Sequence, residues 1–338
     1  MSESENNTIK KQISWKNIKS KYILRHIFEN LEPNLSLNII RYDKELQNKL
    51  DISINNYIKN SRIEIELIPL KNDCGKFMNY GKTFHEYNYH IFFNDNNLEA
   101  HRNYLSYDDN VNKITIQIDY DVYSLFGLFK DCKCIKKIKF KTFYKKGIVD
   151  MSEMFSGCLN LEEVDVSIMK TANVTNMRNM FLSCKSLKEI NISNFDTNKV
   201  LYMSYIFAGC NSLEKIDLSY LNTSNVIDMY SMFYDCVSLE ELNISIFNTC
   251  NAINMDKMFY GCRALKKLEN ININKATSMV HMFTGCSHLE EISFSDFKIH
   301  NIMNMMDMFE ECDSLKKINC SEELKVILME NFPILMFE

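Results

Sequence analysis

The most regular feature of this chain is a set of apolar positions that recurs eight times. In each copy a phenylalanine stands three residues before a cysteine, and successive copies are 26 residues apart except for one step of 24. The pairs are Phe129/Cys132, Phe155/Cys158, Phe181/Cys184, Phe207/Cys210, Phe233/Cys236, Phe259/Cys262, Phe283/Cys286 and Phe309/Cys312. A fixed period of this length predicts a solenoid, in which each repeat forms one coil and buries its apolar residues against its neighbours.

The residues before each cysteine predict a short helix. Met151, Met154, Phe155 and Cys158 are spaced so that they share one face of a helix, and later copies keep this spacing. A side chain that can accept from free amides precedes the first methionine at Asp150, Asn176, Asp228, Asn254, Ser278 and Asn304. Glycine precedes the cysteine in four copies, as at Gly157, and suits a left-handed helix end. We therefore expect a helix of barely two turns, capped at both ends, in each coil.

The residues after each cysteine alternate as they do in a short strand with one buried face. Leu161-x-x-Val164-x-Val166 is the first clear example, and later coils repeat this leucine-rich pattern, L-x-x-L-x-L. Each coil would add one strand to a stacked parallel sheet. The predicted fold class is α/β: a solenoid over residues 124–321 with a parallel β-sheet on one face and short helices on the other.

The repeat as a whole resembles a known family. The string from Val174 to Thr197, VTNMRNMFLSCKSLKEINISNFDT, is similar to the BspA-type leucine-rich repeat, which also occurs in mycoplasma-type surface lipoproteins and in proteins of many protists. The resemblance extends over residues 124–321, with eight repeats of 24 to 26 residues. It implies a right-handed leucine-rich-repeat solenoid that serves protein or surface recognition.

The remaining segments predict caps for the two ends of the solenoid. Residues 1–60 show helical spacing that is interrupted at Pro33 and resumes up to Ile58, which predicts two or three helices. Residues 61–123 alternate apolar and polar side chains, which predicts strands that cover the open edge of the first coil. Together they would form an α+β N-terminal capping region, and residues 322–338 would form a C-terminal cap.

Polar residues between the buried strand positions are the candidate partner-binding site. They would face solvent on the sheet side, because side chains alternate along a strand. The set consists of Asp165, Asn191, Asp217 and Asn243, together with Ser167, Ser193, Ser219 and Ser245. With strands about 4.8 Å apart they would form a polar strip on the order of 35 Å long, enough for a peptide or a protein surface. The alternative is that these side chains pair with their neighbours and tie adjacent coils together.

Composition and charge narrow the possible functions. The chain has 338 residues and a net charge of −5 without a basic stripe, which argues against nucleic acid as a partner. It has eight glycines and no Gly-x-Gly-x-x-Gly, Walker or His-Glu-x-x-His motif, so we predict neither an enzyme nor a bound cofactor. The repeated cysteines lie beside Phe and Met and far apart in sequence, which predicts buried thiols and no metal site.

These observations favour a non-enzymatic scaffold that binds a protein or peptide along the strand face of the solenoid. The first residues contain no apolar signal segment, and the cluster from Val326 to Phe337 is too short and too interrupted to span a membrane, so we expect a cytoplasmic protein. Two alternatives stay open. The segment over residues 20–52 is similar to an F-box, which would make the chain a ubiquitin-ligase substrate adaptor. The bacterial relatives suggest a cell-surface adhesion or recognition protein.

Overall fold

The computed structural model contains two compact units, Met1–Ser61 and Arg62–Glu338. The structure describes residues 18–29, 43–51, 62–80, 89–119, 122–143, 147–244, 247–249, 251–273, 275–295 and 304–332. In the first unit, helix α1 spans Lys21–Glu29 and helix α3 spans Lys44–Leu50. Helix α3 begins where the Asp43 carboxylate accepts from the amide of Leu46. The helical stretch expected up to Ile58 lies outside the described residues.

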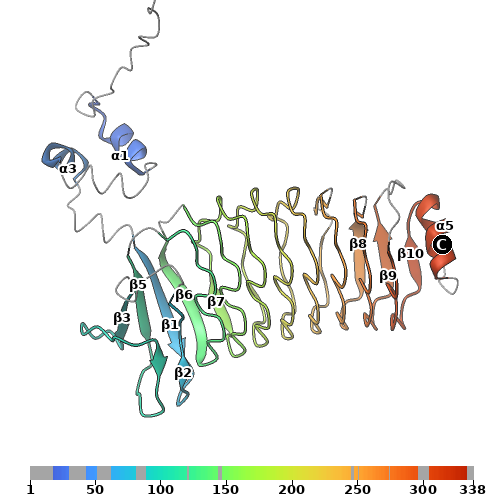
Figure 1. Ribbon diagram of the computed structural model, residues 1–338, viewed down its shortest axis with the longest axis horizontal. Helices are drawn as coiled ribbons and strands as arrows, with labels where there is room; N and C mark the ends of the chain where they lie inside the picture. Colours follow the sequence, from blue (N-terminus) through green and yellow to red (C-terminus); the bar gives the residue numbers. More distant parts are fainter. Residues whose placement is uncertain are drawn as a thin grey trace, which may run out of the picture. The chain divides into compact units, whose positions relative to one another are not determined.

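The second unit starts with a β-sheet whose strand order is β3-β5-β1-β6-β7 (Figure 1). All its pairs are antiparallel except β6 with β7. The strands are β1 (Ile63–Pro69), β3 (Tyr89–Phe93), β5 (Ile114–Ile118), β6 (Ile135–Phe143) and β7 (Glu163–Asp165). A separate pair joins β2 (Gly75–Lys76) to β4 (Tyr104–Leu105). Because β6 belongs to the first coil of the repeat, this sheet continues directly into the coils.

The segment from methionine to cysteine in each coil is a succession of turns, so the short helix predicted there is wrong. Within residues 123–321 the described part of the chain contains no α-helix. The turns close through amides that donate three residues back, as the Cys158 amide does to the Phe155 carbonyl at 3.2 Å. Two residues in the turn segment of every coil have a positive φ: Gly127/Asp131, Glu153/Gly157, Asn179/Ser183, Tyr205/Gly209, Ser231/Asp235, Lys257/Gly261, His281/Gly285 and Asp307/Glu311.

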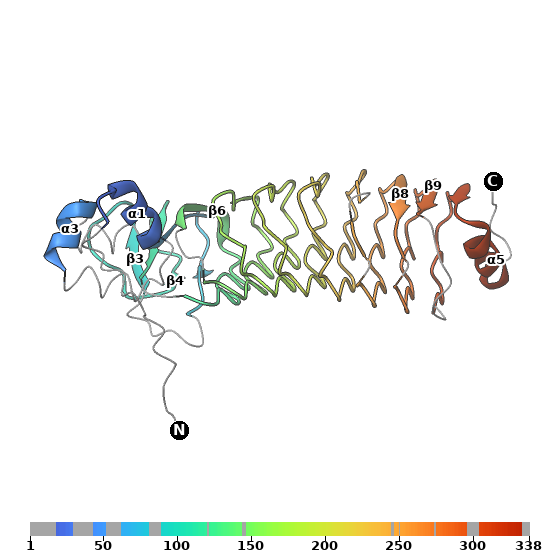
Figure 2. The ribbon, with the colours of Figure 1, turned by 90° about the horizontal axis from the view of Figure 1, so that it is seen from above.

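Backbone hydrogen bonds between coils explain why these segments are not helical. Every second amide donates to the following coil, whereas an α-helix would use it internally. In the second coil the donors are Met151, Glu153, Phe155 and Gly157, and the acceptors are the carbonyls of Asn176, Arg178, Met180 and Leu182, at 2.7 to 3.0 Å. Four such bonds join each pair of successive coils from the first to the eighth, and we call this set of bonds the turn ladder. It holds the coils in register. Figure 2 shows these coils from above, one after another.

The strand face is less regular than predicted. Three parallel strands lie in the last coils in the order β10-β9-β8, namely β8 (Lys267–Ile271), β9 (Glu291–Phe294) and β10 (Lys317–Asn319). The intervening residues 190–192, 216–218 and 242–244 are not strands, so the described coils do not build one continuous parallel sheet. The molecule is mostly β structure with few helices. The middle coils are instead linked by the turn ladder and by isolated parallel bridges such as Asn176↔Tyr202.

The repeated apolar residues form one buried core. The phenylalanine rings of successive coils are stacked, with ring centroids 5.1 to 5.8 Å apart. The repeat cysteines are buried from Cys132 to Cys286 and half-buried at Cys312, which confirms the prediction of core thiols. From Cys158 onward each Sγ donates to the carbonyl of the phenylalanine in the preceding coil, at 3.0 to 3.2 Å. The thiol therefore satisfies a second lone pair of a buried carbonyl.

The two ends of the turn ladder are covered differently. At the first coil, the Asn79 amide donates to the Leu128 carbonyl at 2.7 Å, and its side chain donates to the carbonyls of Gly127 and Lys130. At the other end, helix α5 (Glu322–Asn331) buries Leu324 and Leu328 against the last coil. Among the described residues, no further coil follows the ladder amides of the eighth coil. No helix among the described residues is long and apolar enough to cross a membrane.

Candidate functional site

The polar strip predicted on the strand face consists of side chains that pair within their own coil. The Ser167 hydroxyl and amide both donate to Asp165 Oδ1, at 2.6 and 3.2 Å. Ser193 makes the same two bonds to Asn191, at 2.7 and 3.0 Å. The strip therefore closes the turn after each strand position, a local role typical of Asp, Asn and Ser.

The rest of the strip follows this arrangement where it is described. The Ser219 amide donates to Asp217 Oδ1 at 2.9 Å, and Asn243 is exposed. Ser245 lies outside the described residues. The Ser219 hydroxyl lowers the pKa of Asp217 from its ordinary value, and the Ser167 hydroxyl does the same for Asp165. These carboxylates thus stay ionised at neutral pH, and one oxygen of each is already used by its serine.

A second surface lies over the turns on the other side of the coils. Five half-buried tyrosines gather there, and we call them the tyrosine row: Tyr202, Tyr205, Tyr230, Tyr234 and Tyr260. The rings of Tyr205 and Tyr230 meet edge to face with centroids 5.1 Å apart. Those of Tyr234 and Tyr260 are stacked at 4.8 Å with an interplanar angle of 6°. The row exists because the turn ladder stacks the turns of successive coils, which brings together tyrosines from different turn positions.

Cationic and acidic groups border the tyrosine row. The Arg178 guanidinium lies 3.8 Å from the centre of the Tyr202 ring and donates to Asp228 Oδ2 at 2.8 Å. Burial raises the pKa of Tyr205 and of Tyr234, and a hydrogen bond with Tyr230 adds to the shift at Tyr205. The phenols of Tyr205 and Tyr234 are therefore neutral at physiological pH and can both donate and accept. Rings with a polar tip, next to an arginine, are the side chains most enriched at protein interfaces.

The sequence analysis missed the tyrosine row. The core pattern explains the methionine, phenylalanine and cysteine of each turn, and the residues between them were treated as variable. Tyrosines within the turn segments of three successive coils were the available signal. Its meaning depends on the phase of the turns, because a helix would distribute the same residues around its surface.

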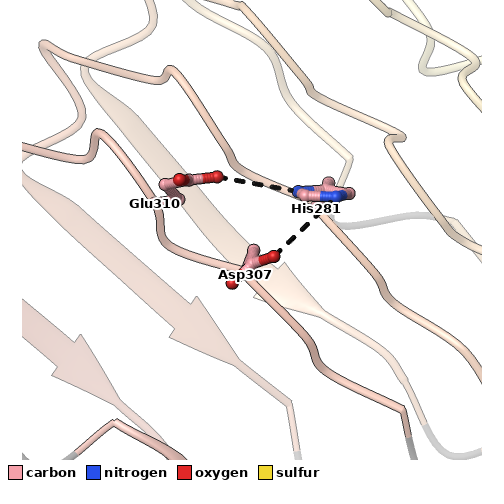
Figure 3. Close-up of side chains that lie close together, drawn as sticks. All are labelled: His281, Asp307 and Glu310. Atoms are coloured by element: carbon pink, nitrogen blue, oxygen red, sulfur yellow. Dashed lines mark ion pairs between the residues drawn. The ribbon is translucent and has the colours of Figure 1, made fainter.

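A third group of side chains, drawn in Figure 3, comes from the seventh and eighth coils. His281 of the seventh coil faces Asp307 and Glu310 of the eighth. His281 Nε2 is 4.0 Å from Asp307 Oδ2, and its Nδ1 is 3.9 Å from Glu310 Oε2. The Tyr260 ring approaches His281 edge-on, with centroids 6.3 Å apart, so this group continues the line of the tyrosine row.

Comparison with known proteins gives a family and a related structure. A family model described as "Mycoplasma protein of unknown function, DUF285" matches residues 123–242, 183–293 and 240–331. No curated protein sequence matches this chain. A crystal structure of a leucine-rich repeat protein from Bacteroides ovatus ATCC 8483 is similar with 18% identity over 63% of this chain and a TM-score of 0.25. The match covers 66% of that protein, so this chain spans slightly less than two thirds of its length.

Proposed function

Because this chain belongs to the DUF285 family through its repeats, we propose that it is a non-enzymatic interaction protein whose stacked coils bind another protein or a peptide. The coils are proposed to form one leucine-rich-repeat solenoid over residues 124–321. A solenoid of this kind suits recognition because each coil adds the same backbone and leaves its outward side chains free to vary. The variable side chains therefore decide which partner is bound.

The tyrosine row is the observation that carries this proposal. Tyrosine supplies a large apolar contact area at a low entropic cost and keeps a hydroxyl for hydrogen bonding. The backbone beneath the rings is held by the turn ladder, with Tyr205 and Ser231 donating to the next coil at 2.9 Å. A partner would thus meet a preformed aromatic surface and would not have to order it.

The strand-face strip is the alternative surface, as the sequence predicts. It offers the second oxygen of Asp217 as an acceptor and would favour a basic partner, whereas Asp165 Oδ2 is already paired with Lys139 Nζ at 3.2 Å. Against it, the hydrogen bonds within each Asp–Ser or Asn–Ser pair already explain these residues structurally. We therefore assign the main contact to the tyrosine row and treat the strip as a secondary one.

Affinity capture with the full-length chain and two surface variants tests which face binds. The first variant carries Tyr230→Ser and Tyr260→Thr. Serine and threonine already occupy these two positions in other coils, as Ser204 and Thr284. The second carries Asn191→Lys and Asp217→Lys. Partners recovered by the wild type and quantified by mass spectrometry should be lost from the tyrosine variant and kept by the lysine variant.

The same experiment separates the other hypotheses. Loss from the lysine variant alone would transfer the binding site to the strand face. Partners that both variants retain would contradict a role for either face. Recovery of ubiquitin-ligase core subunits would favour the adaptor alternative, and recovery of cell-surface components alone would favour the adhesion alternative. Melting temperatures of both variants must equal that of the wild type for these comparisons to hold.

A further inference from the structure

The backbone under His281 and Asp307 is fixed by the fold. The two residues occupy the same turn position in successive coils, with φ of 55° and 54°. The His281 amide donates to the Met306 carbonyl at 2.9 Å, and the Glu310 amide closes its turn on the Asp307 carbonyl at 3.2 Å. The three side chains therefore start from a rigid framework, and only their rotamers adjust.

A buried threonine orients the imidazole. The Thr284 hydroxyl lies 2.6 Å from the Asp307 carbonyl, to which it donates, and 3.2 Å from His281 Nδ1. Since the hydroxyl proton is used on the carbonyl, the oxygen accepts from Nδ1–H. In this tautomer Nε2 carries a free lone pair, and Nε2 is the nitrogen that lies 4.0 Å from Asp307 Oδ2. A hydrogen bond that fixes one ring nitrogen and presents the other is the usual support of a metal-binding histidine.

No permanently charged basic side chain among the described residues pairs with the two carboxylates. Among the described residues, the ion pairs of Asp307 and Glu310 are with His281, which is a cation only when protonated. Lys257 holds the same turn position in the sixth coil and makes no ion pair with either carboxylate in the described part of the chain. Two carboxylates next to an imidazole attract a divalent cation.

From these contacts we propose that His281, Asp307 and Glu310 form a binding site for a divalent first-row transition metal, with Zn²⁺ as its typical occupant. One ligand atom of each residue lies within 4.8 Å of the others. Metal–ligand bonds of about 2.0–2.2 Å need ligand atoms roughly 3.3 Å apart in a tetrahedral site, so the gap of 4.0 Å between Nε2 and Asp307 Oδ2 closes by a small rotamer change, and Glu310 reaches the same ion by turning its carboxylate from Nδ1 toward Nε2.

The ligand types favour this class of ion over Mg²⁺ and Ca²⁺. Those hard cations prefer six or more oxygen ligands, whereas an imidazole with carboxylates suits Zn²⁺ and its neighbours. The side chains of Asp307 and Glu310 are 49% and 56% exposed, so three protein ligands leave at least one position open to water or to a side chain of a partner. The metal would therefore add a coordination point at the end of the tyrosine row.

Metal titration of the full-length chain, freed of metal by a chelator, tests the proposal. Isothermal titration with Zn²⁺, and absorption spectroscopy with Co²⁺, should show one ion per chain. The first two variants are His281→Asn and Asp307→Asn. Asparagine already occupies the same turn position in the third coil, as Asn179, so both variants should keep the fold. Glu310→Gln removes the third ligand charge. Each change should weaken Zn²⁺ binding by about tenfold or more, and Mg²⁺ should not compete.

His288→Asn is the matched control. His288 is an exposed histidine of the seventh coil whose Nδ1 lies 2.8 Å from the Arg263 carbonyl. Its replacement should leave Zn²⁺ affinity unchanged. Zn²⁺ binding that survives His281→Asn with undiminished affinity would overturn the proposal, and so would a thiolate-to-Co²⁺ charge-transfer band. Absence of binding to the wild type would do the same, without affecting the proposed role of the tyrosine row.

Discussion

Removal of one ring from the middle of the phenylalanine stack is the sharpest test of the coil packing. The Phe207 side chain is fully buried, and its ring stacks on Phe181 and on Phe233 with centroids 5.8 and 5.5 Å away. Phe207→Ala would leave a cavity that cannot collapse, because the turn ladder holds the coils on both sides at fixed spacing. Core Phe→Ala changes cost about 3–5 kcal/mol, and each aromatic contact is worth about 0.5–1.5 kcal/mol beyond its buried area. We expect a loss near the upper end of that range.

Urea unfolding followed by circular dichroism measures this loss, with two controls. Phe309 of the last coil stacks on one repeat ring and is 8% exposed, so Phe309→Ala should cost clearly less. Ser219 is exposed, and Ser219→Ala should leave the free energy of unfolding almost unchanged. Coils interact mainly with their neighbours. If two spectroscopic probes give different unfolding curves, the data should therefore be fitted with a model of a linear array of coupled coils. A neutral Phe207→Ala, or equal losses at Phe207 and Phe309, would refute the stacked register.

Three further outcomes follow from individual residues. Burial raises the pKa of the Cys158 thiol to about 12, so thiol reagents at pH 8 should modify the half-exposed Cys74 and Cys320 long before the repeat thiols. Mass spectrometry reads the labelling, and rapid modification of several repeat cysteines in the native protein would place them at the surface. Burial also raises the pKa of Asp235 above 3.8, so the folded state binds the proton more tightly than the unfolded state and the ionised carboxylate destabilises the fold. Asp235→Asn should therefore raise the melting temperature at pH 7. This gain should shrink as the pH falls through the folded pKa of Asp235 and vanish below pH 3.8. Gly261 has a φ of 70° and its missing Cβ would meet the Asp235 carboxylate, so Gly261→Ala should cost at least about 1–2 kcal/mol in urea melts, and an unchanged midpoint would contradict the alignment of the fifth and sixth coils.

The sequence was sufficient to identify the core of the coils but not the path of the backbone around it. Phe155 and Cys158 were expected inside, and both are fully buried. The spacing of three, four and seven residues suits an α-helix, but successive turns with a positive φ at Glu153 and Gly157 bury the same positions. The segment becomes a helix if its amides donate within the segment, and a series of turns if every second amide donates to the next coil. That choice involves residues 25 positions away, as from Phe155 to Met180, and no local pattern encodes it.

The candidate surfaces show the same limit. Asp165 and Ser167 could be identified as outward strand residues, yet their mutual hydrogen bond depends on the local turn. His281 and Asp307 are 26 residues apart and come together only because the coils stack in register. The sequence analysis searched for metal ligands at short spacings among the cysteines, and therefore found none. In a repeat protein, residues one period apart are neighbours, so a search at that spacing is the more informative one.

The turn ladder also aligns the dipoles of its peptide units along the stack of coils. The peptide unit between Asn176 and Met177 accepts from the preceding coil through its carbonyl and donates to the following coil through its amide, both at 3.0 Å. Equivalent units have the same direction in every coil, so their dipoles add along the stack as they do in an α-helix, but with the positive end toward the C-terminus. Lys130 lies at the negative end, and Glu310 and Glu311 lie at the positive end. The acidic side chains of the last coil thus lie beside the partial positive charge at the end of this backbone array.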